Sequence, residues 1–176
     1  YLPEEEATVS IFDRGFLMAH AVYDVTSVLD GKLLEFEGHL ARLKRSLSEL
    51  GMAEPEEMDD LLDIHRKLVE LNEVDQGGVY LQVTRGAADR DFVYPKDAKP
   101  TLVMFTQSKD ILGAPTVATG MKVVSMDDLR WGRRDIKTVQ LLYPSMGKMM
   151  AKAAGADDAW MVEDGFVTEG TSNNAY

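Results

Sequence analysis

The hydrophobic pattern begins with strands. Residues 22–29 are rich in β-branched side chains, which favour the pleated surface of a sheet. The pair Asp30-Gly31 follows, and it predicts a type I′ hairpin turn because both central positions of that turn need positive φ. Residues 33–36 should then form the returning strand. Upstream, residues 8–12 alternate briefly and end at residues 13–15 (Asp-Arg-Gly), which we interpret as a turn.

Apolar residues recur at helical spacing in the next two segments. Four leucines share one face of the first expected helix: Leu40, Leu43, Leu47 and Leu50. Gly51 stands where the residue after a helix belongs. A second helix is expected over residues 56–71, and its apolar stripe includes His65. We interpret this histidine as a core residue, because no metal-ligand spacing surrounds it.

Strands and a helix continue the pattern to the end of the chain. Strands are expected at residues 79–85, 101–106, 122–126, 159–162 and 166–168. A helix over residues 145–154 should turn three methionines inward as core filling: Met146, Met149 and Met150. Asp164-Gly165 gives a second hairpin signal between the last two strands.

This order of elements predicts an α/β or α+β fold with two domains. An N-terminal α/β domain should cover residues 1–110, and residues 111–116 have the composition of a linker. Residues 117–176 should begin a second domain. The sequence stops at residues 174–176 without a helix cap or a polar tail, so we expect that the chain is truncated within that domain.

Composition narrows the possible functions. The 176 residues are 45% hydrophobic, which suffices for a buried core, and the formal charge of −11 argues against nucleic acid and anionic membranes as partners. No apolar run approaches the roughly 18 residues of a membrane span, and no signal peptide follows Tyr1, so we expect a cytoplasmic protein. Zero cysteines exclude disulfides and thiolate catalysis. His20, His39 and His65 lack metal-ligand spacing, so no metal site is expected.

Two polar segments carry candidate chemistry. The first is Arg-Arg-Asp-Ile-Lys-Thr at residues 133–138. It can be a solvated loop, but a lysine beside other cations reaches its neutral amine more easily, and such an amine forms Schiff bases. The second is Val-Thr-Glu-Gly-Thr-Ser-Asn-Asn at residues 167–174. It can be a polar turn, or its glycine and hydroxyl groups can hold a polar ligand closely.

Taken together, these segments resemble the two motifs of the fold-type IV, or class IV, aminotransferases that depend on pyridoxal 5'-phosphate. Further matches appear upstream in the family's order: "DRGF…AVYDV" at residues 13–25, "HLARL" at 39–43 and "VTRGAADRDF" at 83–92. The resemblance covers the whole chain and is strongest toward the D-amino-acid transaminases. It implies the two-domain fold of that family.

The resemblance also implies roles for individual residues. Lys137 would carry the cofactor as a Schiff base and then act as acid and base in the 1,3-proton shift. Glu169 would pair with the pyridine nitrogen. Arg42 would hold the cofactor phosphate. Tyr23 would lie beside the lysine and the substrate carboxylate, and Thr171 and Ser172 would line the cofactor and substrate site. The remaining phosphate contacts would come from loops after Tyr176.

The expected substrate depends on the loop that follows Thr84-Arg85-Gly86, at the end of the expected strand. In D-amino-acid transaminases this loop offers an arginine and, two residues later, a histidine to a carboxylate in the partner subunit's site. Arg90 keeps the arginine, but Phe92 replaces the histidine and cannot donate a hydrogen bond. The expected activity is transfer of an amino group from D-alanine or another D-amino acid to a 2-oxo acid, in a homodimer.

Several alternatives stay open. Aminodeoxychorismate lyases share the lysine and the glutamate and have a similar loop, and branched-chain transaminases and R-selective amine transaminases are further alternatives. The branched-chain enzymes usually show an Arg-Pro pair after this strand, which is missing here. A non-catalytic α/β binding module is a fourth possibility. His20 stands where relatives commonly have Asp or Gly, and the resemblance implies no role for it.

Overall fold

The structure is a computed structural model, and it describes residues 1–173. The chain divides into two compact units. The first consists of Tyr1–Ile111 together with Asp135–Val139, and the second consists of Leu112–Arg134 together with the chain from Gln140 onward. The expected boundary at residues 111–116 stays a prediction, but the segment with the candidate lysine packs with the first unit. Within residues 1–173, every helix is too short or too polar to cross a membrane.

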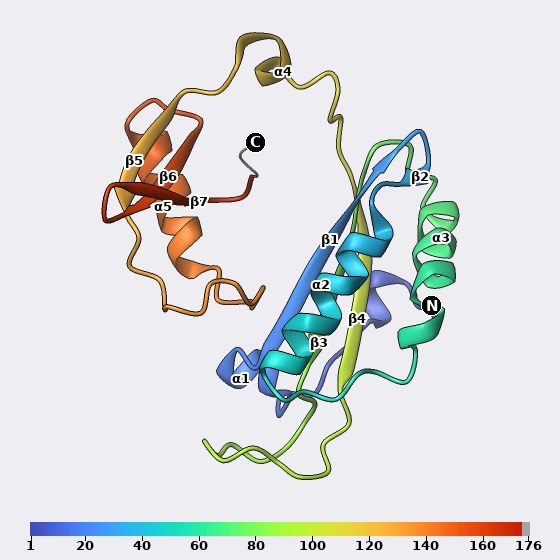
Figure 1. The fold of residues 1–176 in the computed structure, drawn as a ribbon. Coiled ribbons are helices and arrows are strands. Elements are labelled where there is room, and N and C mark those ends of the chain that lie inside the picture. Colours follow the sequence, from blue (N-terminus) through green and yellow to red (C-terminus); the bar gives the residue numbers. More distant parts are fainter. Residues whose placement is uncertain (174–176) are drawn as a thin grey trace. The chain divides into compact units, whose positions relative to one another are not determined.

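An antiparallel sheet with the strand order β2-β1-β3-β4 forms the centre of the first unit (Figure 1). Its strands are β1 (Ala21–Leu29), β2 (Lys32–Leu33), β3 (Gly77–Thr84) and β4 (Thr101–Ser108). Two longer helices, α2 (Phe36–Glu49) and α3 (Leu61–Leu71), pack their apolar faces against it. The core between them contains Val22, Leu47 and Val83, each at most 1% exposed. Burying apolar area on one sheet face is the main stabilising contribution here.

Most sequence expectations for this unit are confirmed. Asp30 and Gly31 have φ of 49° and 67°, as the predicted hairpin turn requires. Gly51 follows α2 with φ of 56°, a left-handed conformation that glycine adopts without strain. His65 is 3% exposed, and its Nδ1 lies 2.6 Å from the Leu61 carbonyl oxygen, as a core histidine should.

Three expectations about its local structure need correction. Residues 33–36 do not form a strand, because β2 ends at Leu33 and α2 begins at Phe36. The expected helix over residues 56–71 is a 3₁₀ turn, η2 (Met58–Asp60), followed by the shorter α3. The interpretation of residues 13–15 as a turn is also wrong, since Asp13 caps the short helix α1 (Arg14–Met18) by accepting from Gly15 N at 2.8 Å. Aspartate favours turns and helix N-caps for the same physical reason. A 3₁₀ turn, η1 (Glu4–Glu6), precedes α1.

The second unit contains a three-stranded sheet with the order β5-β6-β7. Its elements are β5 (Val123–Asp127), α5 (Leu142–Ala153), β6 (Asp158–Glu163) and β7 (Phe166–Gly170), preceded by the short α4 (Pro115–Thr119). The strands β5 and β6 are parallel, so α5 lies in the connection between them, as parallel strands require. The predicted hairpin from β6 to β7 is confirmed, with φ of 52° and 83° at Asp164 and Gly165.

The methionine stripe of α5 does not face the core of this unit. Met146 and Met149 are 57% and 66% exposed, and Met150 is 41% exposed. The buried face consists of small or compact residues: Pro144, Gly147 and Ala151. A Cβ on Gly147 would come within 2.6 Å of the Met126 sulfur, so the helix and sheet approach too closely for a large side chain. The prediction that these methionines fill the core is therefore wrong for residues 1–173.

Candidate active site

The candidate lysine lies on a segment that runs beside β1. Tyr23 N donates to the Lys137 carbonyl at 3.0 Å, and Val139 N donates to the Ala21 carbonyl at 3.2 Å. The neighbouring Ile136 is 3% exposed and belongs to the core cluster of the first unit. This segment is consequently anchored like a short extra strand, and it is not the solvated loop that its charges alone would suggest.

The Lys137 side chain faces an aromatic surface. Its Nζ lies 4.5 Å from the centre of the Tyr23 ring, within the range of a cation–π contact. Tyr23 stacks on Tyr80 at 5.7 Å between ring centres, and Tyr80 stacks on Phe105 at 4.7 Å. Burial raises the pKa of the Tyr80 hydroxyl, which donates to Gln82 at 2.8 Å. The lysine amine thus lies beside the Tyr23 ring, which is itself part of a stack of three aromatic rings.

Arg42 lies on α2 and is held by a carboxylate of β1. Its Nε and Nη2 donate to the two oxygens of Asp24 at 2.8 Å each, and His39 Nδ1 lies 2.7 Å from the same carboxylate. Burial alone would raise the pKa of Asp24, but the hydrogen bonds from His39 and Arg42 outweigh it and the pKa lies below its usual value. A guanidinium has five N–H donors, so Arg42 can meet a phosphate only with donors other than these two. Its phosphate role stays a prediction.

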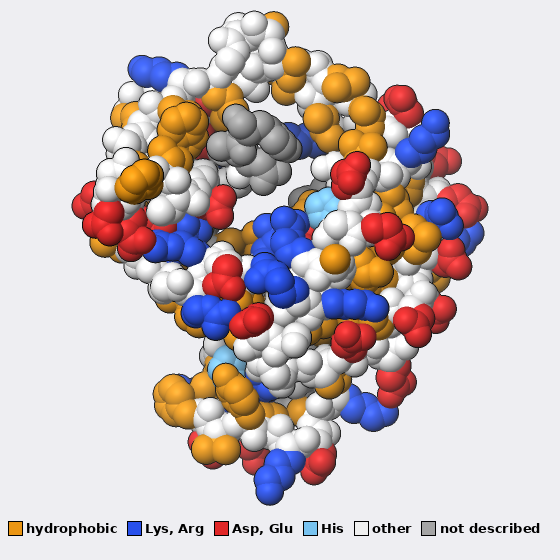
Figure 2. All heavy atoms as spheres, viewed as in Figure 1, with side chains coloured by type: hydrophobic (Ala, Val, Ile, Leu, Met, Phe, Trp, Pro, Cys, Tyr) orange, Lys and Arg blue, Asp and Glu red, His pale blue; other side chains and the backbone are white. Residues whose placement is uncertain are grey.

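The loop with Arg90 protrudes between β3 and β4. Arg90 is exposed, and its guanidinium carbon lies 5.7 Å from the centre of the Phe92 ring. Figure 2 shows hydrophobic side chains at the tip of this loop, where Phe92, Val93 and Tyr94 are 78%, 74% and 52% exposed. The loop presents a cation beside an apolar ring, which suits a ligand with a carboxylate and an apolar part.

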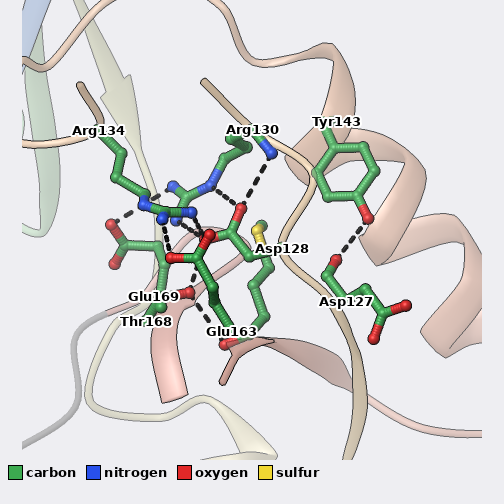
Figure 3. Close-up of polar contacts among 9 residues, drawn as sticks. Asp127, Asp128, Arg130, Arg134, Tyr143, Glu163, Thr168 and Glu169 are labelled. Carbon is green, nitrogen blue, oxygen red and sulfur yellow. Dashed lines mark hydrogen bonds and ion pairs between the residues drawn. The ribbon is translucent and has the colours of Figure 1, made fainter. Parts of the chain in front are cut away.

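Glu169 lies near the end of β7 in the second unit and faces an arginine. Its Oε2 is 3.7 Å from Arg130 Nη1, and its side chain is 44% exposed (Figure 3). The Arg130 side chain is only 13% exposed and donates from Nε and Nη2 to Asp128 at 2.9 and 2.8 Å. Arg130 therefore places a fixed positive charge beside the candidate cofactor ligand.

Asp128 is the buried centre of this network. Its side chain is 0% exposed and accepts from Arg130 and from the Thr168 hydroxyl at 2.6 Å (Figure 3). It also lies 2.6 Å from Arg134 Nη1, and Arg134 pairs further with Glu163. The hydrogen bond from Arg130 is the largest cause that holds the pKa of Asp128 well below its usual range. Arg134, which directly precedes the lysine segment in the sequence, is thus paired within the second unit.

A second buried carboxylate shapes the turn that follows β7. Asp158 is 1% exposed, and its two oxygens accept from the Thr171 hydroxyl and the Asn173 amide. Lys148 Nζ lies 2.9 Å from it. The Thr171 hydroxyl therefore points at protein, whereas Ser172 is exposed. Residues 174–176 of this motif lie outside the described residues.

Sequence reasoning did not identify the carboxylates and the arginine that position the candidate residues. They are Asp24, Asp128, Arg130 and Asp158. One signal was present for two of them, because Asp128 and Arg130 stand two apart directly after an expected strand, where a side chain can reach its neighbour. Asp24 and Asp158 are buried on strands, at 4% and 1% exposed, and a buried charge implies a partner.

Known proteins match this chain along its whole length. The chain is 34% identical over 177 residues to D-alanine aminotransferase of Staphylococcus aureus (strain N315) and 36% identical over 178 residues to that of Bacillus licheniformis. These alignments cover 100% and 99% of this chain, respectively, and 62% of each relative. The chain thus spans less than two thirds of the curated relatives it matches.

Solved structures share the fold. A branched-chain amino acid aminotransferase of Escherichia coli superposes with a TM-score of 0.82 at 14% identity, over 97% of this chain and 60% of that one. A candidate 4-amino-4-deoxychorismate lyase of Legionella pneumophila gives 0.81 at 24%, over 96% and 62%. A third structure, the T.th. branched-chain amino acid aminotransferase complexed with N-(5'-phosphopyridoxyl)-L-glutamate, gives 0.81 at 18%, over 97% and 58%.

The family assignment follows from the sequence match. A model of the family described as amino-transferase class IV matches residues 21–176, which include both the lysine and the glutamate motifs. The fold expected from these motifs is confirmed by the structures named above. The chain belongs to the class IV aminotransferases.

Proposed function

We propose that the intact protein transfers the amino group of a D-amino acid, with D-alanine foremost, to a 2-oxo acid. The observation that carries this proposal is the 34–36% identity to D-alanine aminotransferases over essentially the whole chain. The retained Arg90 supports it, because an arginine fork suits the carboxylate that both amino acid and 2-oxo acid possess.

The chain offers suitable groups for pyridoxal 5'-phosphate as the cofactor. An amine, a carboxylate and a guanidinium are present at Lys137, Glu169 and Arg42, and these match the aldehyde, the pyridine nitrogen and the phosphate of that molecule. The bound cofactor supplies a ring that withdraws electrons from the substrate Cα. One structural neighbour is complexed with a phosphopyridoxyl compound, which supports the same cofactor here.

Lys137 would carry the cofactor through its Nζ and later move a proton at the substrate Cα. The contact of Nζ with the Tyr23 ring and the backbone hydrogen bonds of its segment restrict where this amine can reach. Such restriction favours transfer, because a positioned acid or base acts over hydrogen-bond distances. We therefore propose that the Tyr23 ring orients the amine and that Tyr23 also lies beside the substrate carboxylate.

The Glu169 carboxylate would accept a hydrogen bond from the protonated pyridine nitrogen of the cofactor. Arg130 supports this role, because its positive charge lies 3.7 Å from Oε2 and favours the ionised carboxylate. Thr171 and Ser172 follow directly and would line the same site. The buried Asp158 holds Thr171, so the turn is shaped before any ligand binds.

Arg90 would bind the substrate carboxylate with little help from its neighbour. Phe92 cannot donate a hydrogen bond, so Arg90 carries the charge recognition alone. A charge-assisted hydrogen bond contributes about 1.5–3 kcal/mol, which corresponds to roughly 10- to 150-fold in affinity. Arg90→Ala should raise the KM for D-alanine by about that factor and leave an amine without a carboxylate, such as 1-phenylethylamine, unaffected. Equal losses for both donors would show that Arg90 is structural.

The deciding experiment is a product assay with the intact protein. D-alanine should yield pyruvate only when a 2-oxo acid such as 2-oxoglutarate is present as acceptor. Pyruvate released from aminodeoxychorismate without any acceptor would instead favour the lyase. Turnover of 1-phenylethylamine without turnover of D-alanine would favour an R-selective amine transaminase.

A homodimer completes the proposal. The loop with Arg90 and Phe92 is exposed, so it can reach a second subunit, and two-fold dimers are the commonest homo-oligomers. Sedimentation of the intact protein as an active monomer would contradict this part.

A further inference from the structure

Arg14 has a fully buried guanidinium, and its hydrogen bonds reach the loop that carries Arg90. The residue is 1% exposed and begins α1. Its Nη2 donates to the Asp91 carbonyl at 2.6 Å, and its Nη1 donates to the Asp89 carbonyl at 3.3 Å. Within residues 1–173, no ion pair joins Arg14 to an Asp or Glu. The buried charge is therefore balanced by backbone dipoles of the loop, which makes these contacts costly to lose.

The two carbonyl acceptors lie on either side of Arg90. The Asp89 carbonyl belongs to the peptide plane that enters Arg90, and the Asp91 carbonyl belongs to the plane that leaves Asp91. Since peptide planes are rigid, only the backbone dihedrals of Arg90 and Asp91 lie between two held planes. The hydrogen bonds from Arg14 therefore restrict the backbone conformation at Arg90 and, with it, the direction of the Arg90 side chain.

Arg14 is itself held by an interlock between two sequence motifs. Asp13 accepts from the Thr84 hydroxyl at 2.8 Å, and Arg14 N donates to the Gly86 carbonyl at 2.9 Å. A Cβ on Gly15 would come within 2.6 Å of Thr84 Cγ2. At Gly86, which has φ of 82°, a Cβ would come within 1.9 Å of the Lys99 carbonyl oxygen. Asp-Arg-Gly at residues 13–15 and Thr-Arg-Gly at residues 84–86 consequently form one packed joint.

His20 and Tyr94 pack against the arginines of this joint, and Tyr94 belongs to the loop that carries Arg90. Arg14 Nε donates to His20 Nδ1 at 3.3 Å, so that nitrogen is an acceptor and carries no proton. Burial, followed by the charges of Arg14 and Arg85, lowers the pKa of His20, in agreement with a neutral ring. The Tyr94 ring packs against His20 at 5.4 Å and over the Arg85 guanidinium at 3.7 Å.

We propose that Arg14 is the positioning residue of the substrate-carboxylate site, acting through the loop that carries Arg90. This inference rests on the proposed function, in which Arg90 binds the carboxylate of the amino acid and the 2-oxo acid. It also gives His20 a function, as the neutral acceptor that orients Arg14. Arg14 touches no reacting atom in this account, so its loss should change substrate affinity more than turnover.

The first test measures the loop directly by amide hydrogen exchange of the intact protein. Arg14→Lys keeps the charge but loses the planar fork, and it should raise exchange in residues 87–94 by at least about tenfold. Exchange in β1 and β3 should stay unchanged. Lys99→Ala is the matched control, because it removes an exposed ion pair with Glu56 from the same loop and should change little.

The second test asks whether Arg14 acts through Arg90. Arg14→Lys should raise the KM for D-alanine about tenfold, while kcat changes less than about twofold. In the Arg90→Ala background, the same substitution should add no further rise, because the group that it positions is gone. A rise of equal factor in both backgrounds would overturn the inference.

A surface variant keeps the inference testable if Arg14→Lys does not fold. Tyr94 is 52% exposed, so Tyr94→Ala should fold, and it should increase exchange in residues 87–94 and raise the KM in the same direction. Unchanged exchange in the folded variants would overturn the proposed joint. A wild-type protein that does not convert D-alanine would overturn the proposed function instead, and the exchange measurement would still decide whether Arg14 holds the loop.

Discussion

The segments that carry Lys137 and Glu169 are held in place by different physical means. Lys137 is fixed by backbone hydrogen bonds to β1, by a buried isoleucine and by an aromatic ring. Glu169 stands beside Arg130, whose position depends on the buried carboxylate of Asp128. Backbone pairing and apolar packing tolerate many side-chain changes, whereas a network of buried charges fails when one partner is removed. The segment with Lys137 and the segment with Glu169 should therefore respond differently to substitution.

The largest effect is expected at the lysine. Lys137→Ala removes the only amine proposed for both cofactor attachment and proton transfer, so the rate should fall by at least about 10³-fold. Folding should be little affected, because the segment is held mainly by its backbone. Lys122→Ala is an exposed control that should keep full activity. Turnover assays together with thermal unfolding compare the two variants.

The buried carboxylate should show the opposite pattern, with a large effect on stability. Asp128→Asn leaves Arg130 and Arg134 without their shared charge, and breaking a buried pair in this way costs about 3–5 kcal/mol of unfolding free energy. Asp127→Asn, at the exposed neighbouring position, should change stability by less than about 0.5 kcal/mol. Denaturant unfolding measures both variants, and equal small changes would show that the network contributes little.

Glu169→Gln should separate chemistry from folding within the second unit. The amide cannot stabilise a proton on the pyridine nitrogen, so turnover should fall about 10²-fold, while the fold and cofactor content are kept. Glu163→Gln removes the same charge from the same hairpin, where the carboxylate pairs with Arg134, and should change turnover by less than about twofold. A loss of soluble protein with normal turnover in the remainder would indicate a structural Glu169.

Acid should weaken the second unit through Asp128. The pKa of this carboxyl is lower in the folded protein than its ordinary value of 3.8, so the unfolded chain binds more protons between the two values. The contribution to stability is complete above that ordinary value and is lost as pH falls through the folded pKa. The difference in unfolding free energy between wild type and Asp128→Asn should therefore shrink on acidification below about pH 4. A constant difference would contradict the proposed ionisation.

Sequence reasoning succeeded where a pattern has one physical solution. The Asp30-Gly31 turn, the end of α2 before Gly51 and the buried His65 follow from positive φ and from helical spacing. The prediction that Met149 is buried failed. Small residues such as Gly147 and Ala151 face the sheet and let α5 approach it closely, and hydrophobicity alone does not indicate this. The sequence also does not show which charged side chains pair: no local pattern indicates that Asp24 binds Arg42.

The lysine segment shows the same limit for the candidate site. Its charges favour a solvated loop. The neighbouring cations suggest a reactive amine, but only the resemblance to a family gives Lys137 the cofactor. In the structure, the single apolar residue Ile136 turns into the core and brings the lysine beside Tyr23. Long-range packing of this kind joins residues more than a hundred positions apart, and a local pattern does not encode it.

Borohydride reduction of the intact protein with pyridoxal 5'-phosphate, followed by peptide mapping, shows directly whether Lys137 carries the cofactor. We expect the reduced cofactor to be attached to Lys137, in the peptide that contains Asp-Ile-Lys-Thr, and the Lys137→Ala variant to carry no label. Attachment to Lys122 or Lys148, or retention of the label in the Lys137→Ala variant, would contradict it.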